Sequence, residues 1–227
     1  TLHKGSIMGH TCHILEDPRY TTFRMNVNVT EPYNADFDGD ELNIHVPQSI
    51  QTVCELHLLT SAIRHVISPT TSKVIIKPKQ DTTMGSFVLT YDDIIVDWKT
   101  AMNILAATTV SVNIPKHKPI SGKHLLSQIF PKDLNISRSN VKIVNGLLES
   151  GQIGNSDMAP IIHKIYFQHG PNKTRDFIDN LQRMILLFLM KHGFTVGARD
   201  TVLPKDILSQ VHEMIETKRK ELVSQIT

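Results

Sequence analysis

The stretch around residues 34–41 constrains this chain more than any other, because it places three aspartates at alternate positions. Asp36, Asp38 and Asp40 lie close together, with Gly39 between the second and the third. Two carboxylates about 4 Å apart repel each other by about 4 kcal/mol at an effective dielectric constant near 20. The loop that carries them therefore needs a cation. Carboxylate ligands without neighbouring Cys or His suit Mg²⁺, Mn²⁺ or Ca²⁺ rather than zinc or copper.

The aspartates fit the first ligand positions of an EF-hand calcium loop, but the rest of that pattern fails. Glu41 stands where the loop needs its turn glycine, and Pro47 stands where it needs a bidentate glutamate. What remains is a compact carboxylate cluster that leaves room for water or substrate phosphates, as in polymerase-type Mg²⁺ sites. A polar surface turn stays open as the alternative, because Asp and Gly are also common turn residues.

Alternating side chains on both sides of the aspartates predict two strands. Hydrophobic residues alternate with polar ones over residues 23–30, and again over residues 42–47. We expect these strands to hold the loop rigidly, with Gly39 letting the chain bend so that the carboxylates converge. Phe37, between two of the acids, is expected to be a buried anchor.

Composition sets broad limits. In 227 residues, 40% are hydrophobic, which is enough for a real core, and the net charge is only +2. Cys12 and Cys54 are the only cysteines, so the chain has no disulfide framework and is expected in a reducing, intracellular compartment. The apolar run from Met184 to Met190 is far short of the roughly 20 residues that span a bilayer. No membrane association is expected.

Local signals predict several further elements. Ser49 is a plausible N-cap for a helix, and Asn145–Gly146 indicates a hairpin with a type I′ turn. Residues 174–192 have helical periodicity, and Gly193 follows as a left-handed cap. Pro204 suits the first turn of a last helix.

The sequence around the aspartates resembles that of a known family. The run from Asn34 to Asp40 matches the characteristic motif of the largest subunit of multisubunit DNA-directed RNA polymerases. Residues 1–4 and 47–49 look like the eukaryotic form of that subunit. Weaker matches occur at residues 80–82, 122–123, 144–146 and 193–200, so the resemblance covers essentially the whole chain in order.

The resemblance implies an α+β fold in three parts. Residues 1–70 would be the segment of a double-psi β-barrel active-site domain that carries the metal loop. Residues 71–200 would be a pore region of mixed helices and strands. Residues 201–227 would begin the helices of the funnel.

The resemblance also implies the roles of individual residues. Asp36, Asp38 and Asp40 would hold the catalytic Mg²⁺ for nucleotidyl transfer from ribonucleoside triphosphates to the RNA 3′ end. The ion would bind the RNA 3′-hydroxyl and the α-phosphate of the incoming nucleotide. Asn34 resembles the family residue that senses the nucleotide sugar, and Lys4 would contact a phosphate.

The partners implied are the second-largest polymerase subunit, smaller subunits, the DNA template and the RNA transcript. The location would be the nucleus for a cellular protein, and the cytoplasm or virion for a viral one. Arg199 departs from the family, which usually has glycine in this run. Together with apparently short loops, that departure suggests a divergent copy from a large DNA virus.

Two other functions stay open. The chain could belong to a single-chain, two-barrel RNA polymerase of the RNA-silencing type, which shares a shorter aspartate motif. It could instead be a non-catalytic module that binds a divalent cation. In each case we expect this chain to be a segment of something longer, and we expect the isolated segment to bind Mg²⁺ weakly without polymerising.

Overall fold

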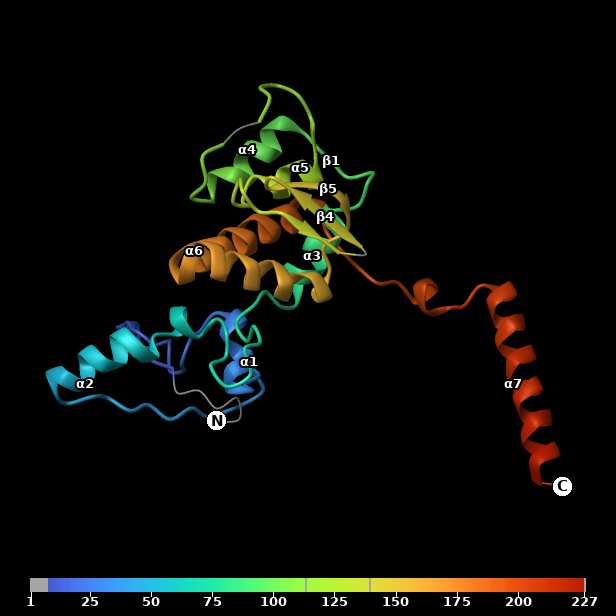
Figure 1. Cartoon of the computed structure of the whole chain (residues 1–227), viewed down its shortest axis with the longest axis horizontal. Helices are drawn as coiled ribbons and strands as arrows, with labels where there is room; N and C mark the ends of the chain where they lie inside the picture. The colour runs from blue at the N-terminus through green and yellow to red at the C-terminus, as the bar shows by residue number, and fades with distance from the viewer. Residues whose placement is uncertain (1–7, 113, 139, 227) are drawn as a thin grey trace. The chain divides into compact units, whose positions relative to one another are not determined.

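The computed structural model describes residues 8–112, 114–138 and 140–226 (Figure 1). Its contacts divide the chain after Lys191 into two units. In the first unit, the described part contains most of the helices and all of the strands. The second unit, from His192 onward, contains one short and one long helix.

Helix α6, Asn155–His192, is the longest element, and a break divides it into two arms. Gly170 has φ 80° and ψ 178° inside it, and Pro171 follows. Glycine adopts this backbone conformation readily, and proline cannot donate the helical hydrogen bond, so the two arms meet at an angle. The predicted helix over residues 174–192 is confirmed as the second arm. Gly193 follows it with φ 73°, as predicted.

Three shorter helices pack with α6 around one hydrophobic core. They are α3, Asp81–Leu89; α4, Trp98–Ala106; and α5, Gly122–Ser127. The side chains of Leu89, Ile104 and Leu126 are almost completely buried, as are Ile162 and Ile165 of the first arm of α6. Burying each such side chain contributes about 1.5–3 kcal/mol, so this core is the stable part of the unit.

Two small antiparallel sheets border these helices. One pairs β1, Ile95–Val96, with β2, Ile120–Ser121. The other has the order β3–β4–β5, formed by Ile136–Ser137, Val141–Val144 and Leu147–Gly151. The predicted hairpin is confirmed between β4 and β5. Asn145 and Gly146 both have positive φ, as a type I′ turn requires.

Asn180 joins the second arm of α6 to the loop after α4. Its buried Oδ1 accepts the Thr109 N–H at 3.0 Å, and its Nδ2 donates to Thr109 Oγ1 at 3.0 Å. Asn180→Ala would leave the Thr109 N–H and hydroxyl without these hydrogen-bond partners, so we expect it to lower the free energy of unfolding by about 1–3 kcal/mol. Asn172→Ala, at an exposed position of the same arm, should change it by less than about 0.5 kcal/mol. Urea unfolding followed by the fluorescence of Trp98 measures both, and equal effects would contradict the prediction.

The prediction of two strands beside the aspartates is wrong. Val27–Val29 form a 3-10 helix, η1, and Thr30–Tyr33 form the one-turn helix α1. The Asn26 side chain accepts the Asn28 N–H, and Thr30 Oγ1 donates to the Val27 carbonyl. These local bonds favour a helical turn over a strand. Residues 42–47 pair with no strand in the described part of the chain.

A double-psi β-barrel is therefore not formed by the described residues. Before β1, they contain only isolated bridges, between Gly9 and Ser61 and between Ile67 and Val74. A barrel requires strands paired on both edges, and the segment around the aspartates offers none. The mixture of helices and small sheets fits the coarser α+β prediction.

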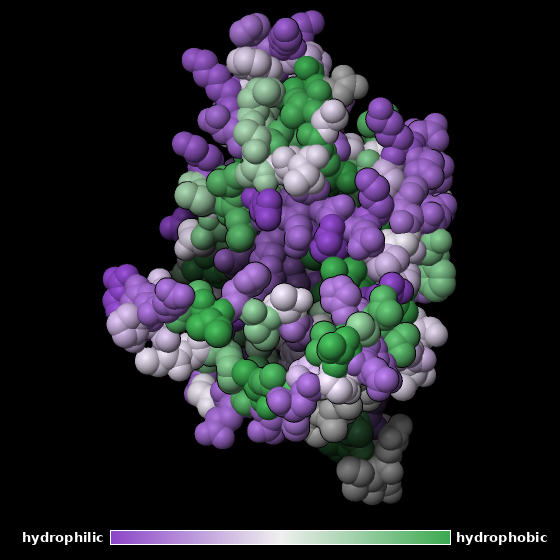
Figure 2. Space-filling view, turned by 90° about the vertical axis from the view of Figure 1, so that its left-hand side faces the viewer, coloured by the Kyte–Doolittle hydropathy of each residue, from purple (hydrophilic) through white to green (hydrophobic). Residues whose placement is uncertain are grey.

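The predicted cap at Ser49 is confirmed. Its side chain accepts the Thr52 N–H at the start of α2, Ile50–Glu55. The chain continues through a π-helical turn, η2, Leu56–Thr60, and a 3-10 turn, η3, Ala62–His65. Hydrophobic side chains along this segment, including Ile50, Val53 and Leu59, are exposed. On the face at the α2 end, Figure 2 shows hydrophobic patches among hydrophilic side chains.

The second unit contains η4, Ala198–Thr201, and α7, Lys205–Ile226. The predicted last helix is confirmed and begins just after Pro204. Arg199 lies in η4 without positive φ, so this turn forms without the backbone freedom of glycine. Among the described residues, none of the helices is both long and apolar enough to cross a membrane.

Candidate metal centre

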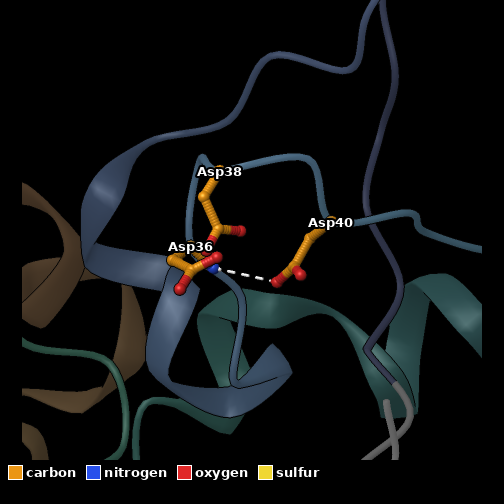
Figure 3. A group of neighbouring side chains, drawn as sticks. All are labelled: Asp36, Asp38 and Asp40. Atoms are coloured by element: carbon orange, nitrogen blue, oxygen red, sulfur yellow. Dashed lines mark hydrogen bonds between the residues drawn. The ribbon is translucent and has the colours of Figure 1, made fainter.

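The three aspartates converge as their spacing predicts. Asp36, Asp38 and Asp40 each place one carboxylate oxygen within 4.8 Å of the others. Figure 3 shows the side chains pointing toward one another across the loop. Six ligands about 2.1 Å from one Mg²⁺ lie about 3–4 Å from each other. A small closure of the loop therefore suffices to bring all three oxygens onto one ion.

Backbone geometry sets the shape of this loop. Asn34 ends α1 in the left-handed conformation, with φ 49° and ψ 39°, and Gly39 has φ 121°. Asparagine and glycine tolerate these conformations better than other residues. Inside the loop, the Asp36 N–H donates to Asp40 Oδ2 at 3.1 Å, which draws the two ends together (Figure 3).

The crowded carboxylates alter proton binding. A hydrogen bond with the Asp38 carboxyl raises the pKa of Asp36 above its usual 3.8, and reduced hydration and the Asp38 charge act in the same direction. Like charges held close together disfavour the ionised form of each carboxyl. A divalent cation would relieve the same repulsion more fully, so the residues fit such an ion.

The donor set favours a hard cation. All three candidate ligands are carboxylates, and no His or Cys belongs to the cluster formed by the described residues. Because all three side chains are exposed, the open side of the loop is accessible to water or to a phosphate. This combination suits Mg²⁺ or Mn²⁺ better than zinc, which prefers nitrogen and sulfur ligands.

Other predicted features of the site have different outcomes. Phe37 is 69% exposed, so it is not the buried anchor predicted from the sequence. Asn34 lies at the base of the loop, between α1 and the aspartates. Lys4 lies outside the described residues.

Sequence reasoning missed the contacts that hold the base of the loop. Asn26 and Asn28 both donate their side-chain amides to Gln182, on the second arm of α6. The recurrence of asparagine at alternate positions was the available signal. The strand prediction for residues 23–30 instead places both asparagines on the exposed face of a strand, and that strand does not form.

Comparison with known proteins identifies the family. Residues 1–62 match the family model described as RNA polymerase Rpb1, domain 2, and residues 65–201 match that of RNA polymerase Rpb1, domain 3. The chain belongs to the RNA polymerase Rpb1 family. This confirms the predicted resemblance to the largest polymerase subunit, and it favours that interpretation over the single-chain, two-barrel one.

Individual Rpb1 relatives cover the chain almost completely. It is 50% identical to DNA-directed RNA polymerase subunit 1 of Acanthamoeba polyphaga mimivirus, over all of this chain and 16% of the viral protein. It is 36% identical to DNA-directed RNA polymerase II subunits RPB1-A and RPB1-B of Trypanosoma brucei brucei, over 98% of this chain and 14% of each relative. The chain thus spans a small part of these subunits, and the similarity to a viral subunit agrees with the predicted viral type.

Proposed function

We propose that this chain is the catalytic-centre segment of the largest subunit of a DNA-dependent RNA polymerase. In this proposal, Asp36, Asp38 and Asp40 hold the Mg²⁺ used for nucleotidyl transfer from ribonucleoside triphosphates to the RNA 3′ end. The observation that carries it is the convergence of three carboxylate oxygens within 4.8 Å in a member of the Rpb1 family.

The three aspartates have a positioning and charge-balancing role in this reaction. When bound, the metal ion supplies Lewis-acid activation of the attacking 3′-hydroxyl and stabilises charge on the transferred phosphate. The carboxylates fix its position from one side of the loop. Their exposure leaves the other side to the RNA end and the incoming nucleotide.

The proposed partners are the second-largest subunit, smaller subunits, the DNA template and the RNA transcript. Exposed hydrophobic side chains on α2 and η2 support an assembled state, because such patches usually mark contact surfaces. A non-catalytic cation-binding module has the three converging carboxylates in its favour, since such a cluster can bind a divalent cation without any reaction.

Metal removal tests the proposed function. In the assembled polymerase, extension of RNA annealed to a DNA template should stop when EDTA removes divalent ions, and Mg²⁺ should restore it. The isolated chain should not extend RNA with or without Mg²⁺. Extension that persists in excess EDTA, or robust templated synthesis by this chain alone, would contradict the proposal.

Asn34 is proposed to sense the sugar of the incoming nucleotide. Asn34→Gly keeps the left-handed backbone accessible and removes the side chain, so discrimination against deoxynucleotides should fall by about tenfold, the loss of one useful hydrogen bond. Asn34→Ser should also lower it. Asn43→Gly, at an exposed position beyond the aspartates, is the matched control and should leave it unchanged. The ratio of kcat/KM for ribonucleotides and deoxynucleotides measures the discrimination. Equal ratios in all variants would contradict the assignment of sugar sensing to Asn34.

A further inference from the structure

The side chain of Gln182 links helix α6 to the segment that leads into the aspartate loop. Its Oε1 accepts the Asn26 Nδ2 at 2.7 Å and the Asn28 Nδ2 at 3.1 Å. More than 150 residues of sequence separate the partners. The second arm of α6, whose other face is buried in the core, therefore holds the base of the loop.

The orientation of these side-chain amides follows from a backbone bond. Asn26 Oδ1 accepts the Asn28 N–H at 2.9 Å, so the Asn26 side chain presents its nitrogen to Gln182. Gln182 must then present its oxygen, because two amide nitrogens facing each other cannot form a hydrogen bond. The link therefore uses Gln182 only as an acceptor.

Short runs of chain, each closed by local hydrogen bonds, connect this link to the aspartates. Asn28 lies in η1, and Thr30 Oγ1 donates to the Val27 carbonyl in the same turn. The Thr30 carbonyl accepts N–H groups from both Asn34 and Ala35. Asp36, the first candidate ligand, is the next residue.

Burial indicates that this arrangement is held firmly. Asn28 is 2% exposed and Thr30 is 5% exposed, whereas the aspartates are exposed. Asn28 Oδ1 is buried and has no hydrogen-bond partner among the described residues. Burying it without a partner costs free energy, which the other contacts of this side chain must offset. The strands expected to stabilise the loop are absent, so the link to α6 takes their place.

We propose that Gln182 is a positioning residue for the metal loop, acting through Asn26 and Asn28. The inference rests on the proposed function, because it assigns to α6 the task of keeping Asp36, Asp38 and Asp40 in a metal-binding arrangement. Gln182 itself touches neither substrate nor ion. Its contribution lies in lowering the mobility of residues 30–40.

Two variants separate the acceptor from the rest of the side chain. Gln182→Met keeps the length and removes the acceptor, whereas Gln182→Glu keeps two acceptor oxygens. Asn26→Asp weakens the link from the other side, because it keeps the cap oxygen and removes the donor of the shorter of the two hydrogen bonds, and it leaves α6 and the Asn28 donor unchanged. Gln168→Met, at an exposed position on the first arm of α6, is the matched control.

The test uses the assembled polymerase with the full-length subunit. Hydrogen exchange of the Asn34 and Ala35 amides should accelerate by about tenfold in Gln182→Met and Asn26→Asp. It should be unchanged in Gln182→Glu and Gln168→Met, and the amides of α6 should keep their protection throughout. Binding of Mn²⁺, measured by electron paramagnetic resonance, should weaken by about tenfold in the same two variants and not in the other two.

Each outcome bears on the inference separately from the proposed function. Unchanged exchange in Gln182→Met and Asn26→Asp would overturn the inference, as would equal losses in Gln182→Met and Gln182→Glu. Loss of α6 protection in Gln182→Met without any effect of Asn26→Asp would overturn it too, because the role would then be one of helix stability. If exchange responds as expected but Asp38→Asn binds Mn²⁺ as well as the wild type, the link stands and the proposed metal site fails.

Discussion

Asp38→Asn in the assembled polymerase is expected to lower the rate of nucleotide addition by at least about 1,000-fold, because a bound metal ion contributes several kcal/mol to catalysis. Asp38 supplies one of three converging oxygens, and its carboxyl helps to raise the pKa of Asp36. The amide side chain has nearly the same shape but no charge. The ion would lose part of its charge balance while the loop keeps its fold, and extension of a template-bound RNA at saturating nucleotide measures the rate.

Glu41→Gln is the matched control for this experiment. Glu41 is an exposed acid in the same loop, and it lies outside the cluster of three aspartates. The substitution removes the same unit of charge, so it should change the rate by less than about threefold, as a screened surface charge. Equal losses in the two variants would mean that the overall charge of the loop matters and that the three converging oxygens do not.

Gly122→Ala is expected to destabilise the first unit by about 3 kcal/mol, at the upper end of the usual cost of overpacking. Gly122 begins α5, and a Cβ atom there would lie 1.9 Å from the carbonyl oxygen of Leu89 and 2.9 Å from its Cδ1. Leu89 ends α3 and is completely buried. Backbone would have to move, so α3 and α5 could not keep their contact.

Gly154→Ala provides the comparison, because a Cβ atom at that position meets nothing closer than 3.7 Å. It should leave the stability unchanged or raise it by about 0.4–1 kcal/mol, by restricting the unfolded chain. Trp98 lies on α4 in the same unit, so its fluorescence during urea unfolding reports on both variants. Similar midpoints for the two alanine variants would contradict the close contact between α3 and α5.

Local signals in the sequence were sufficient where the structure is decided locally. The turn at Asn145–Gly146 requires two residues with positive φ, and the cap at Ser49 requires one side-chain oxygen, so both were predictable. The convergence of the aspartates was predictable for the same reason, because all three lie in one short loop.

Competition between local and long-range interactions explains why the predicted strand and the predicted burial of Phe37 are wrong. Residues 23–30 alternate as a strand does, but Asn26 and Thr30 bond to nearby backbone and favour η1 and α1. Phe37 is predicted to be a buried anchor of the loop, yet its side chain is 69% exposed. Burial depends on what lies opposite a side chain, which its own neighbours in sequence do not specify.

The contact between Gln182 and the two asparagines was beyond sequence reasoning for a further reason. The alternate asparagines mark only one side of the contact, because hydrogen bonds between residues this far apart have no periodicity or spacing that identifies Gln182 as the partner. The family resemblance predicted a barrel around the aspartates, and the described residues instead hold the loop through α6. The domain boundaries at residues 70 and 200 stay predictions.

Binding of Mn²⁺ to the assembled polymerase shows whether Asp36, Asp38 and Asp40 hold the metal ion. Electron paramagnetic resonance counts tightly bound Mn²⁺, and Mg²⁺ should compete for the same site because both prefer oxygen ligands. We expect one such site in the wild type and in Glu41→Gln, and its loss in Asp38→Asn. Tight, Mg²⁺-sensitive binding that is equal in all three proteins would contradict the assignment of the metal site to Asp36, Asp38 and Asp40.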